Sequence, residues 1–291
     1  MKGCALCLDN SNWGNFMKFG LIAAAAVAAL AAPVANAALD LQVVGSVNLT
    51  SAFGLAFDGT NVWYSTGFGT IGRLNKDTMT LFGSTYGTGH WGEMAYDGTN
   101  VIVAGQNDGK LYSYSTFDGS AQGSKQLLNA PETGLIDGLD IDGGKVYYSP
   151  DVSNIYRYDY ASASFEATLA TGGGGFSGVE KVHVGTNDFL IVVNDASSPR
   201  RLCRMGLDGT FNSASDCASL PNSRYEGLAF DGRYIYAADY YGNRIDKIDL
   251  KVGGGSIFVP PVGSIPEPET YAMMLAGLGV MGMVARRRRS A

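Results

Sequence analysis

Histidine is nearly absent from this sequence, and several residue patterns that usually mark a catalytic centre are missing with it. Only His90 and His183 occur, too few for a histidine-rich metal site. No Gly-x-Ser-x-Gly motif is present, which excludes the usual nucleophile of α/β-hydrolases. The four glycines at 172–175 lack the Lys-Ser/Thr of a phosphate-binding loop, so we interpret them as a connecting loop. The sequence therefore offers no standard catalytic signature.

Charged residues are also scarce, at 16% of the chain, and the cations are outnumbered. Residues 38–265 contain 24 acidic and 15 basic side chains, a net charge of −9. Such acidity argues against binding to nucleic acid or to anionic lipid headgroups. It favours cations or neutral sugars as ligands.

The N-terminus has the pattern of a secretory signal. Met17-Lys18 precedes an apolar run over residues 19–32, and Ala35-Asn36-Ala37 fits the small-x-small cleavage rule. We predict a signal peptide over residues 1–37, with Met17 as an alternative start, and a mature chain that begins at Ala38.

Cysteine is rare as well, with four residues in the chain. Cys4 and Cys7 precede Met17, and we interpret their spacing as incidental. Cys203 and Cys217 remain in the exported part, where the compartment is oxidising. We predict one disulfide between them, with two free thiols as the alternative.

Glycine and tyrosine are abundant, with 40 and 16 residues, and the body repeats itself. The recurring unit is GLAFDGTNVWYS, at residues 54–65. Its other copies begin at residues 93, 138, 180 and 227, and the glycine of each turn follows the previous one by 39 to 47 residues. Each copy predicts an inner strand that ends in an Asp-Gly turn, a nearly continuous apolar second strand, and two further strands.

Four strands in about 40 to 47 residues is the period of a β-propeller blade. We predict an all-β propeller over residues 38–250 with five blades; six is the alternative count, because the third and fourth copies are irregular. Residues 39–49 are a spare strand that would complete the fifth blade and protect its edge. NIYRYD at 154–159 and GNRIDKIDL at 242–250 resemble strands of NHL-type and lactonase-type propellers.

The C-terminal part divides into a Gly/Pro linker, residues 251–265, and a tail, residues 266–291. The tail begins with the rigid step Pro266, Glu267 and Pro268. An uncharged apolar run follows at 271–285, and then the cations Arg286, Arg287, Arg288 and Arg289. As a helix, the run reaches about 22 Å, short of a hydrocarbon core of about 30 Å. It spans the membrane only if the arginine stems extend it, with the upstream chain outside.

This order of Pro-Glu-Pro, short transmembrane helix and arginine cluster closely resembles the PEP-CTERM sorting signal of Gram-negative bacteria. The resemblance implies export across the inner membrane, recognition and cleavage by an exosortase, and transfer to the cell surface or extracellular matrix. The alternative is a permanent single-span anchor.

Acidic side chains lie at or just before the inner strand in four of the five copies. They are Glu93, Asp137, Glu180 and Glu226. Inner strands surround the channel of a propeller, so these carboxylates are candidate ligands for Ca²⁺. The alternative is that they are solvated, or paired with Arg224 and Lys181. Trp91 and Tyr225 lie beside them and are candidates for stacking on a sugar; the alternative is packing between blades.

Two functions follow from these observations. The first is a surface or matrix protein whose propeller binds a glycan such as an exopolysaccharide, another protein, or a cation. The alternative is an exported metal-dependent hydrolase of lactonase type that uses Glu93, Glu180 or Glu226. We favour binding, because no residue spacing requires a general base or a positioned metal.

Overall fold

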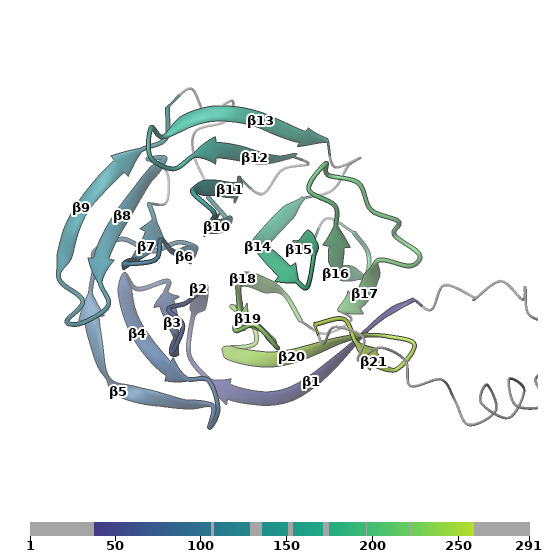
Figure 1. Cartoon of the computed structure of the whole chain (residues 1–291). Coiled ribbons are helices and arrows are strands. Elements are labelled where there is room, and N and C mark those ends of the chain that lie inside the picture. The colour runs from purple at the N-terminus through teal and green to yellow at the C-terminus, as the bar shows by residue number, and fades with distance from the viewer. Residues whose placement is uncertain are drawn as a thin grey trace, which may run out of the picture. The chain divides into compact units, whose positions relative to one another are not determined.

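The computed structural model describes residues 38–258, apart from 106–107, 129–135, 151–153, 171–174, 196 and 221–222. The described chain folds into five antiparallel sheets arranged as blades around a central channel (Figure 1). The predicted five-bladed, all-β propeller is therefore confirmed. Among the described residues, no helix has the length and apolar character needed to cross a membrane.

Each blade runs outward from an inner strand beside the channel (Figure 1). The first blade contains β2 (Ala52–Phe57), β3 (Asn61–Thr66), β4 (Thr70–Asn75) and β5 (Thr80–Gly87). The second contains β6 (Met94–Tyr96), β7 (Asn100–Ala104), β8 (Lys110–Ser115) and β9 (Ala121–Gln126). The third contains β10 (Gly138–Asp142), β11 (Lys145–Ser149), β12 (Asn154–Asp159) and β13 (Ser164–Ala170).

The fourth and fifth blades follow the same plan, but the fifth takes its outermost strand from the start of the chain. The fourth contains β14 (Phe176–Val184), β15 (Asn187–Asn194), β16 (Arg200–Met205) and β17 (Cys217–Leu220). The fifth contains β18 (Tyr225–Phe230), β19 (Ile235–Asp239), β20 (Arg244–Val252) and β1 (Leu39–Asn48), with the short β21 (Gly255–Ser256) paired to β20.

The closing strand β1 pairs with β20 from Leu39 opposite Val252 to Asn48 opposite Arg244. This pairing confirms the predicted role of the spare N-terminal strand, and it covers an edge of β20 that would otherwise be open. A second connection lies beside it, between the fifth and first blades. Tyr236 Oη and Lys247 Nζ both donate to the backbone oxygen of Lys76, at 2.9 and 2.8 Å.

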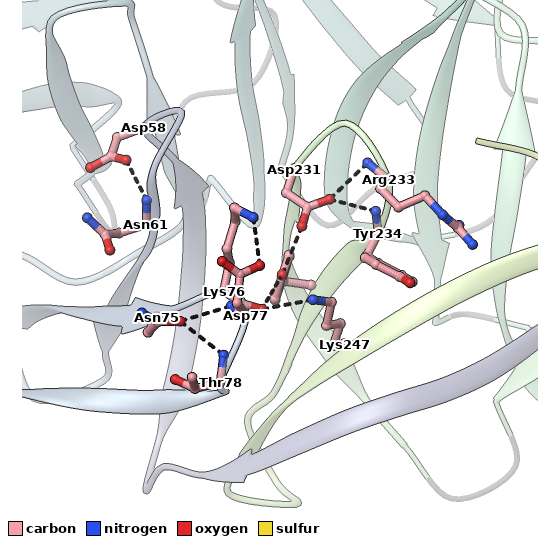
Figure 2. Close-up of polar contacts among 11 residues, drawn as sticks. Asp58, Asn61, Asn75, Lys76, Asp77, Thr78, Asp231, Arg233, Tyr234 and Lys247 are labelled. Atoms are coloured by element: carbon pink, nitrogen blue, oxygen red, sulfur yellow. Dashed lines mark hydrogen bonds and ion pairs between the residues drawn. The ribbon is translucent and has the colours of Figure 1, made fainter. Parts of the chain in front are cut away.

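The Asp-Gly turns have the geometry expected of tight hairpin turns. Gly59 has a φ of +91°, which glycine adopts without strain. Asp58 Oδ1 accepts hydrogen bonds from the backbone of Thr60 and Asn61. Asp231 Oδ1 accepts from Arg233 and Tyr234 in the turn of the fifth blade; Figure 2 shows these two bonds and the bond to Asn61. These aspartates are therefore occupied in stabilising turns.

The second strands β3, β7, β11, β15 and β19 are buried over most of their length, because neighbouring blades cover both faces. Serines at the ends of two of them join one blade to the next. Ser65 accepts a bond from the Gly54 backbone and donates to the Gly92 oxygen at 2.6 Å. Ser149 donates to the Phe176 oxygen in the same way.

The fifth blade continues beyond residue 250. Gly253 and Gly254 both have positive φ and form the turn that leads into β21. The Phe258 ring then packs 4.8 Å from that of Phe230. Residues 251–258, which the sequence assigned to the linker, are therefore part of the propeller. The predicted signal peptide at 1–37, the rest of the linker and the predicted apolar helix of the tail lie outside the described residues.

Candidate functional site

The inner strands of neighbouring blades approach so closely that their backbones are in contact. A Cβ atom on Gly227 of β18 would lie 2.3 Å from the Phe53 oxygen of β2. A Cβ atom on Gly54 would lie 2.4 Å from the Gly92 oxygen. Glycine is required where backbones meet in this way. The channel is therefore narrow, with a loop mouth where the inner strands begin and a turn mouth where they end at the Asp-Gly turns.

Three carboxylates in the channel accept backbone N–H groups from the neighbouring blade; Glu93 and Asp140 are buried, and Glu180 is half-buried. The bonds join Asp140 Oδ2 to Lys181 N (2.9 Å), Glu180 Oε1 to Phe230 N (2.8 Å) and Glu93 Oε1 to Leu55 N (2.9 Å). An inner strand is the edge of its sheet, so the N–H groups that face the channel have no strand partner. The carboxylates satisfy these donors and connect the blades at the centre of the molecule.

The channel raises the pKa of all three acids. Burial raises the pKa of Glu93 well above its usual range, and repulsion from Asp137 and Glu226 raises it further. Burial also raises the pKa of Glu180 well above its usual range, and repulsion from Asp140 raises it further. For Asp140, burial raises the pKa to about 7, although its hydrogen bonds to backbone N–H groups oppose the shift.

The four predicted acids are distributed along the channel. Glu93, Asp137 and Glu226 lie near enough to interact electrostatically. Glu180 also interacts electrostatically with Glu93, but its hydrogen bond is to Phe230 at the turn mouth. Among the described residues, no three His, Cys, Asp or Glu side chains are arranged to hold a metal ion. Calcium binding by the four acids stays a prediction.

Glu226 is paired with a cation, as the alternative interpretation of the sequence proposed. Arg224 Nε lies 2.9 Å from Glu226 Oε1 and 3.1 Å from Asp195 Oδ2. Lys181 pairs with Asp142 and Asp188 at the turn mouth. One cation at each mouth is therefore held between two carboxylates.

Tyr225 lies inside the fold, with 1% of its surface exposed. Its side chain packs in the core between the fourth and fifth blades, and its hydroxyl donates to Asp246 Oδ2 at 2.8 Å. Asp246 also contacts Arg244 and accepts from Ser46 of the closing strand. The structure therefore leaves no face of Tyr225 available for stacking on a sugar.

Trp91 is 37% exposed at the loop mouth and belongs to a continuous group of rings. Phe53 contacts Trp91 edge-on at 5.6 Å and Tyr240 at 5.8 Å, and Tyr240 contacts Tyr241 at 5.2 Å. We call these four residues the aromatic arc; they come from the second, first and fifth blades. The Arg224 guanidinium lies 4.9 Å over the Tyr241 ring and donates to its hydroxyl.

The structure joins Cys203 and Cys217 by a disulfide. The two residues lie directly opposite each other on β16 and β17. The bond fastens the short outer strand of the fourth blade to its neighbour.

Sequence reasoning missed Asp140 and the tyrosines of the aromatic arc. Asp140 lies within β10, whereas the sequence predicted acids at or just before the inner strands; Glu180 also lies within its strand, β14, and not at its start as predicted. Tyr240 and Tyr241 follow the second strand of the last copy, where the other copies have no matching pair. A search for aromatic residues at the ends of second strands would have identified them.

The fold defines this body as a β-propeller, and solved structures share the architecture. The chain is similar to glutaminyl cyclase of Myxococcus xanthus, with 14% identity and a TM-score of 0.58 over 74% of this chain and 98% of that chain. The Pan2 WD40 domain of Neurospora crassa is less similar, with 11% identity and a TM-score of 0.41 over 72% of this chain and 65% of that one. The first similarity supports the fold alone. No curated protein matches the sequence.

The C-terminal tail carries the sorting signal of this propeller. Residues 264–289 match the PEP-CTERM protein-sorting motif. The match includes the Pro266-Glu267-Pro268 step and the arginines at 286–289, so the predicted resemblance is confirmed. The motif is a recognition signal for exosortase processing, and it implies export across the inner membrane and association with the cell envelope. The protein is an exported β-propeller with a PEP-CTERM tail.

Proposed function

We propose that this protein is delivered to the cell surface or extracellular matrix, where the loop mouth of its propeller binds a glycan. The observation that supports this proposal is the aromatic arc. Trp91 and Tyr241 lie near its two ends with 37% and 64% of their surfaces exposed. Phe53 and Tyr240 connect them through edge-on ring contacts.

The chemistry of the arc suits a neutral sugar. Apolar faces of a sugar ring pack against aromatic rings, and nearby polar groups bond to its hydroxyls. The Tyr241 hydroxyl and Arg224 provide such groups at one end of the arc. Because Arg224 is already paired with Asp195 and Glu226, it adds little attraction for an anionic sugar. The net charge of −9 on residues 38–265 disfavours anionic sugars further.

Processing would release the propeller from the membrane. We propose that signal peptidase removes residues 1–37 and that an exosortase cleaves near Pro266. The mature protein would then contain the propeller and the Gly/Pro linker, without the apolar run at 271–285. Such a product is free to join an exopolysaccharide matrix.

The test is binding of purified protein to exopolysaccharide from its native host, by co-sedimentation and by calorimetry on fragments. We expect Trp91→Ala and Tyr241→Ala each to weaken binding at least tenfold. Phe117→Ala is the matched control, because this ring is 88% exposed but lies in the turn between β8 and β9, away from the arc. Unchanged binding by both arc variants would refute the proposal.

The hydrolase alternative predicts a different result with the same material. A lactonase-type enzyme would hydrolyse lactones and lose that activity in the double variant Glu93→Gln, Glu226→Gln. A glycan-binding protein would show no hydrolysis above buffer, and its sugar affinity would depend on the arc. Lactone hydrolysis that disappears in the double variant would favour the enzyme.

A further inference from the structure

A cavity of about 260 Å³ lies at the turn mouth, at the end of the channel opposite the aromatic arc. Residues from all five inner strands line it, next to the turns that end those strands. It is therefore formed only when the ring of blades is closed. Its volume corresponds to about nine water molecules at 30 Å³ each, which suits a ligand of roughly ten non-hydrogen atoms.

Aromatic rings line this cavity from three blades. Phe57, Tyr96 and Phe230 each lie directly before an Asp-Gly turn, on β2, β6 and β18. They occupy the same position in three copies of the repeat. The negative face of an aromatic ring attracts a cation, and the attraction is stronger where water is excluded.

Carboxylates supply much of the remaining polarity of the cavity, beside Lys181 and His183, of which His183 contacts Asp188. Asp140 and Glu180 both line it, from β10 and β14. Both oxygens of Asp140 accept backbone N–H groups. Glu180 uses Oε1 to accept the Phe230 N–H, and Oε2 makes no hydrogen bond with the described residues. One carboxylate oxygen is thus available to a ligand in the cavity.

Lys181 also lines the cavity, and its ion pairs are with carboxylates other than Asp140 and Glu180. Its ammonium lies 2.5 Å from Asp142 Oδ2 and 3.1 Å from Asp188 Oδ2. Two anions already compensate this one cation. The charge of Asp140 and Glu180 is therefore left to be balanced by protons or by a ligand.

We infer that the turn-mouth cavity binds a small organic ammonium compound. The ammonium group would lie among Phe57, Tyr96 and Phe230, with Glu180 as its counter-ion. The absence of a suitable trio of metal-binding side chains in the described residues makes a bare metal ion a poorer fit than an organic cation. A bound cation would also stabilise the ionised forms of Asp140 and Glu180, whose pKa values burial holds high.

The experiment is calorimetric titration of the purified protein with choline and with n-butylammonium. The uncharged isostere of choline, 3,3-dimethyl-1-butanol, is the matched ligand control. We expect at least one ammonium compound to bind and the isostere not to bind. Binding of choline alone identifies a quaternary ammonium site, and binding of n-butylammonium identifies a site for primary ammonium groups.

Variants then locate the site. Glu180→Gln keeps an oxygen to accept the Phe230 N–H but removes the charge, so affinity should fall at least tenfold. Phe57→Leu removes a ring and should weaken binding severalfold. Phe117→Ala, in the exposed turn between β8 and β9, should bind as the unmodified protein does. The inference is overturned if neither ammonium compound binds, if the neutral isostere binds equally well, or if folded Glu180→Gln retains full affinity.

Discussion

Replacing Glu93 by glutamine should change the stability of the protein in a way that depends on pH: relative to the unmodified protein, the variant should gain stability as the pH rises. Glu93 Oε1 accepts the N–H groups of both Leu55 and Met94, each at 2.9 Å. Glu93 Oε2 is buried and has no hydrogen-bond partner among the described residues. A glutamine can keep both bonds through its oxygen and place its amide nitrogen at the unbonded position. The substitution therefore removes the ionisable group, and the added cost of its buried amide N–H donors does not change with pH.

The direction in which the free energy of unfolding changes with pH follows from the direction of the pKa shift. Burial, together with repulsion from Asp137 and Glu226, raises the folded-state pKa of Glu93 above the value of 4.5 for a free side chain. Between these two pKa values the folded protein holds a proton that the unfolded chain releases. The free energy of unfolding then falls as pH rises, by about 1.4 kcal/mol per pH unit for one proton. Below pH 4.5 the full contribution is present.

Glu93→Gln lacks this loss, so its advantage over the unmodified protein should grow with pH. From pH 5 to pH 7 the difference should increase by at most about 3 kcal/mol. Guanidinium denaturation at pH 5, 6, 7 and 8 measures it, and subtraction of the two curves removes the contribution of the other acids. Parallel curves would show that Glu93 is ionised in the folded state, which would refute the reasoning.

Glu93→Leu is the matched control. It also removes the charge, but it leaves the Leu55 and Met94 N–H groups without an acceptor. Each buried donor left unbonded costs about 1–3 kcal/mol. Glu93→Leu should therefore be less stable than Glu93→Gln by an amount that does not change with pH.

Three further predictions concern the closure, the disulfide and calcium. Gly227→Ala should lower the free energy of unfolding by at least about 1–3 kcal/mol, because its Cβ would lie 2.3 Å from the Phe53 oxygen. Gly83→Ala is the control: nothing lies within 4 Å of its Cβ, so the free energy of unfolding should change little. Replacing Cys203 and Cys217 by serine should cost about 3 kcal/mol in denaturation, as expected for a loop of about 15 residues, and equal stability would contradict this. If the predicted acids hold Ca²⁺, calcium should raise the melting midpoint and EGTA should lower it; an unchanged midpoint would reject calcium binding.

The repeat made the architecture predictable from the sequence. Asp-Gly turns and apolar second strands recur with every blade, so each copy specifies the same hairpin and the same buried middle strand. The spare strand at 39–49 could be placed because the last copy ended after its third strand. The end of the propeller was less predictable: Gly253 and Gly254 resemble a flexible linker in sequence, whereas in the fold they form a tight turn.

The site was less predictable, because side-chain direction depends on tertiary packing. Trp91 and Tyr225 both lie just before or at an inner strand, yet Trp91 reaches the surface and Tyr225 enters the core between blades. Similarly, Glu93 and Glu180 appear as equivalent acids in the repeat. Their hydrogen bonds place them at different depths of the channel. Local sequence does not encode either difference.

We propose that this exported propeller reaches its destination after losing its PEP-CTERM tail. Intact-mass spectrometry of the mature protein from its native host tests this proposal. We predict a chain that begins at Ala38 and lacks the arginines at 286–289. A mature protein that still carries Arg286, Arg287, Arg288 and Arg289 would contradict the proposal and would indicate a permanent membrane anchor.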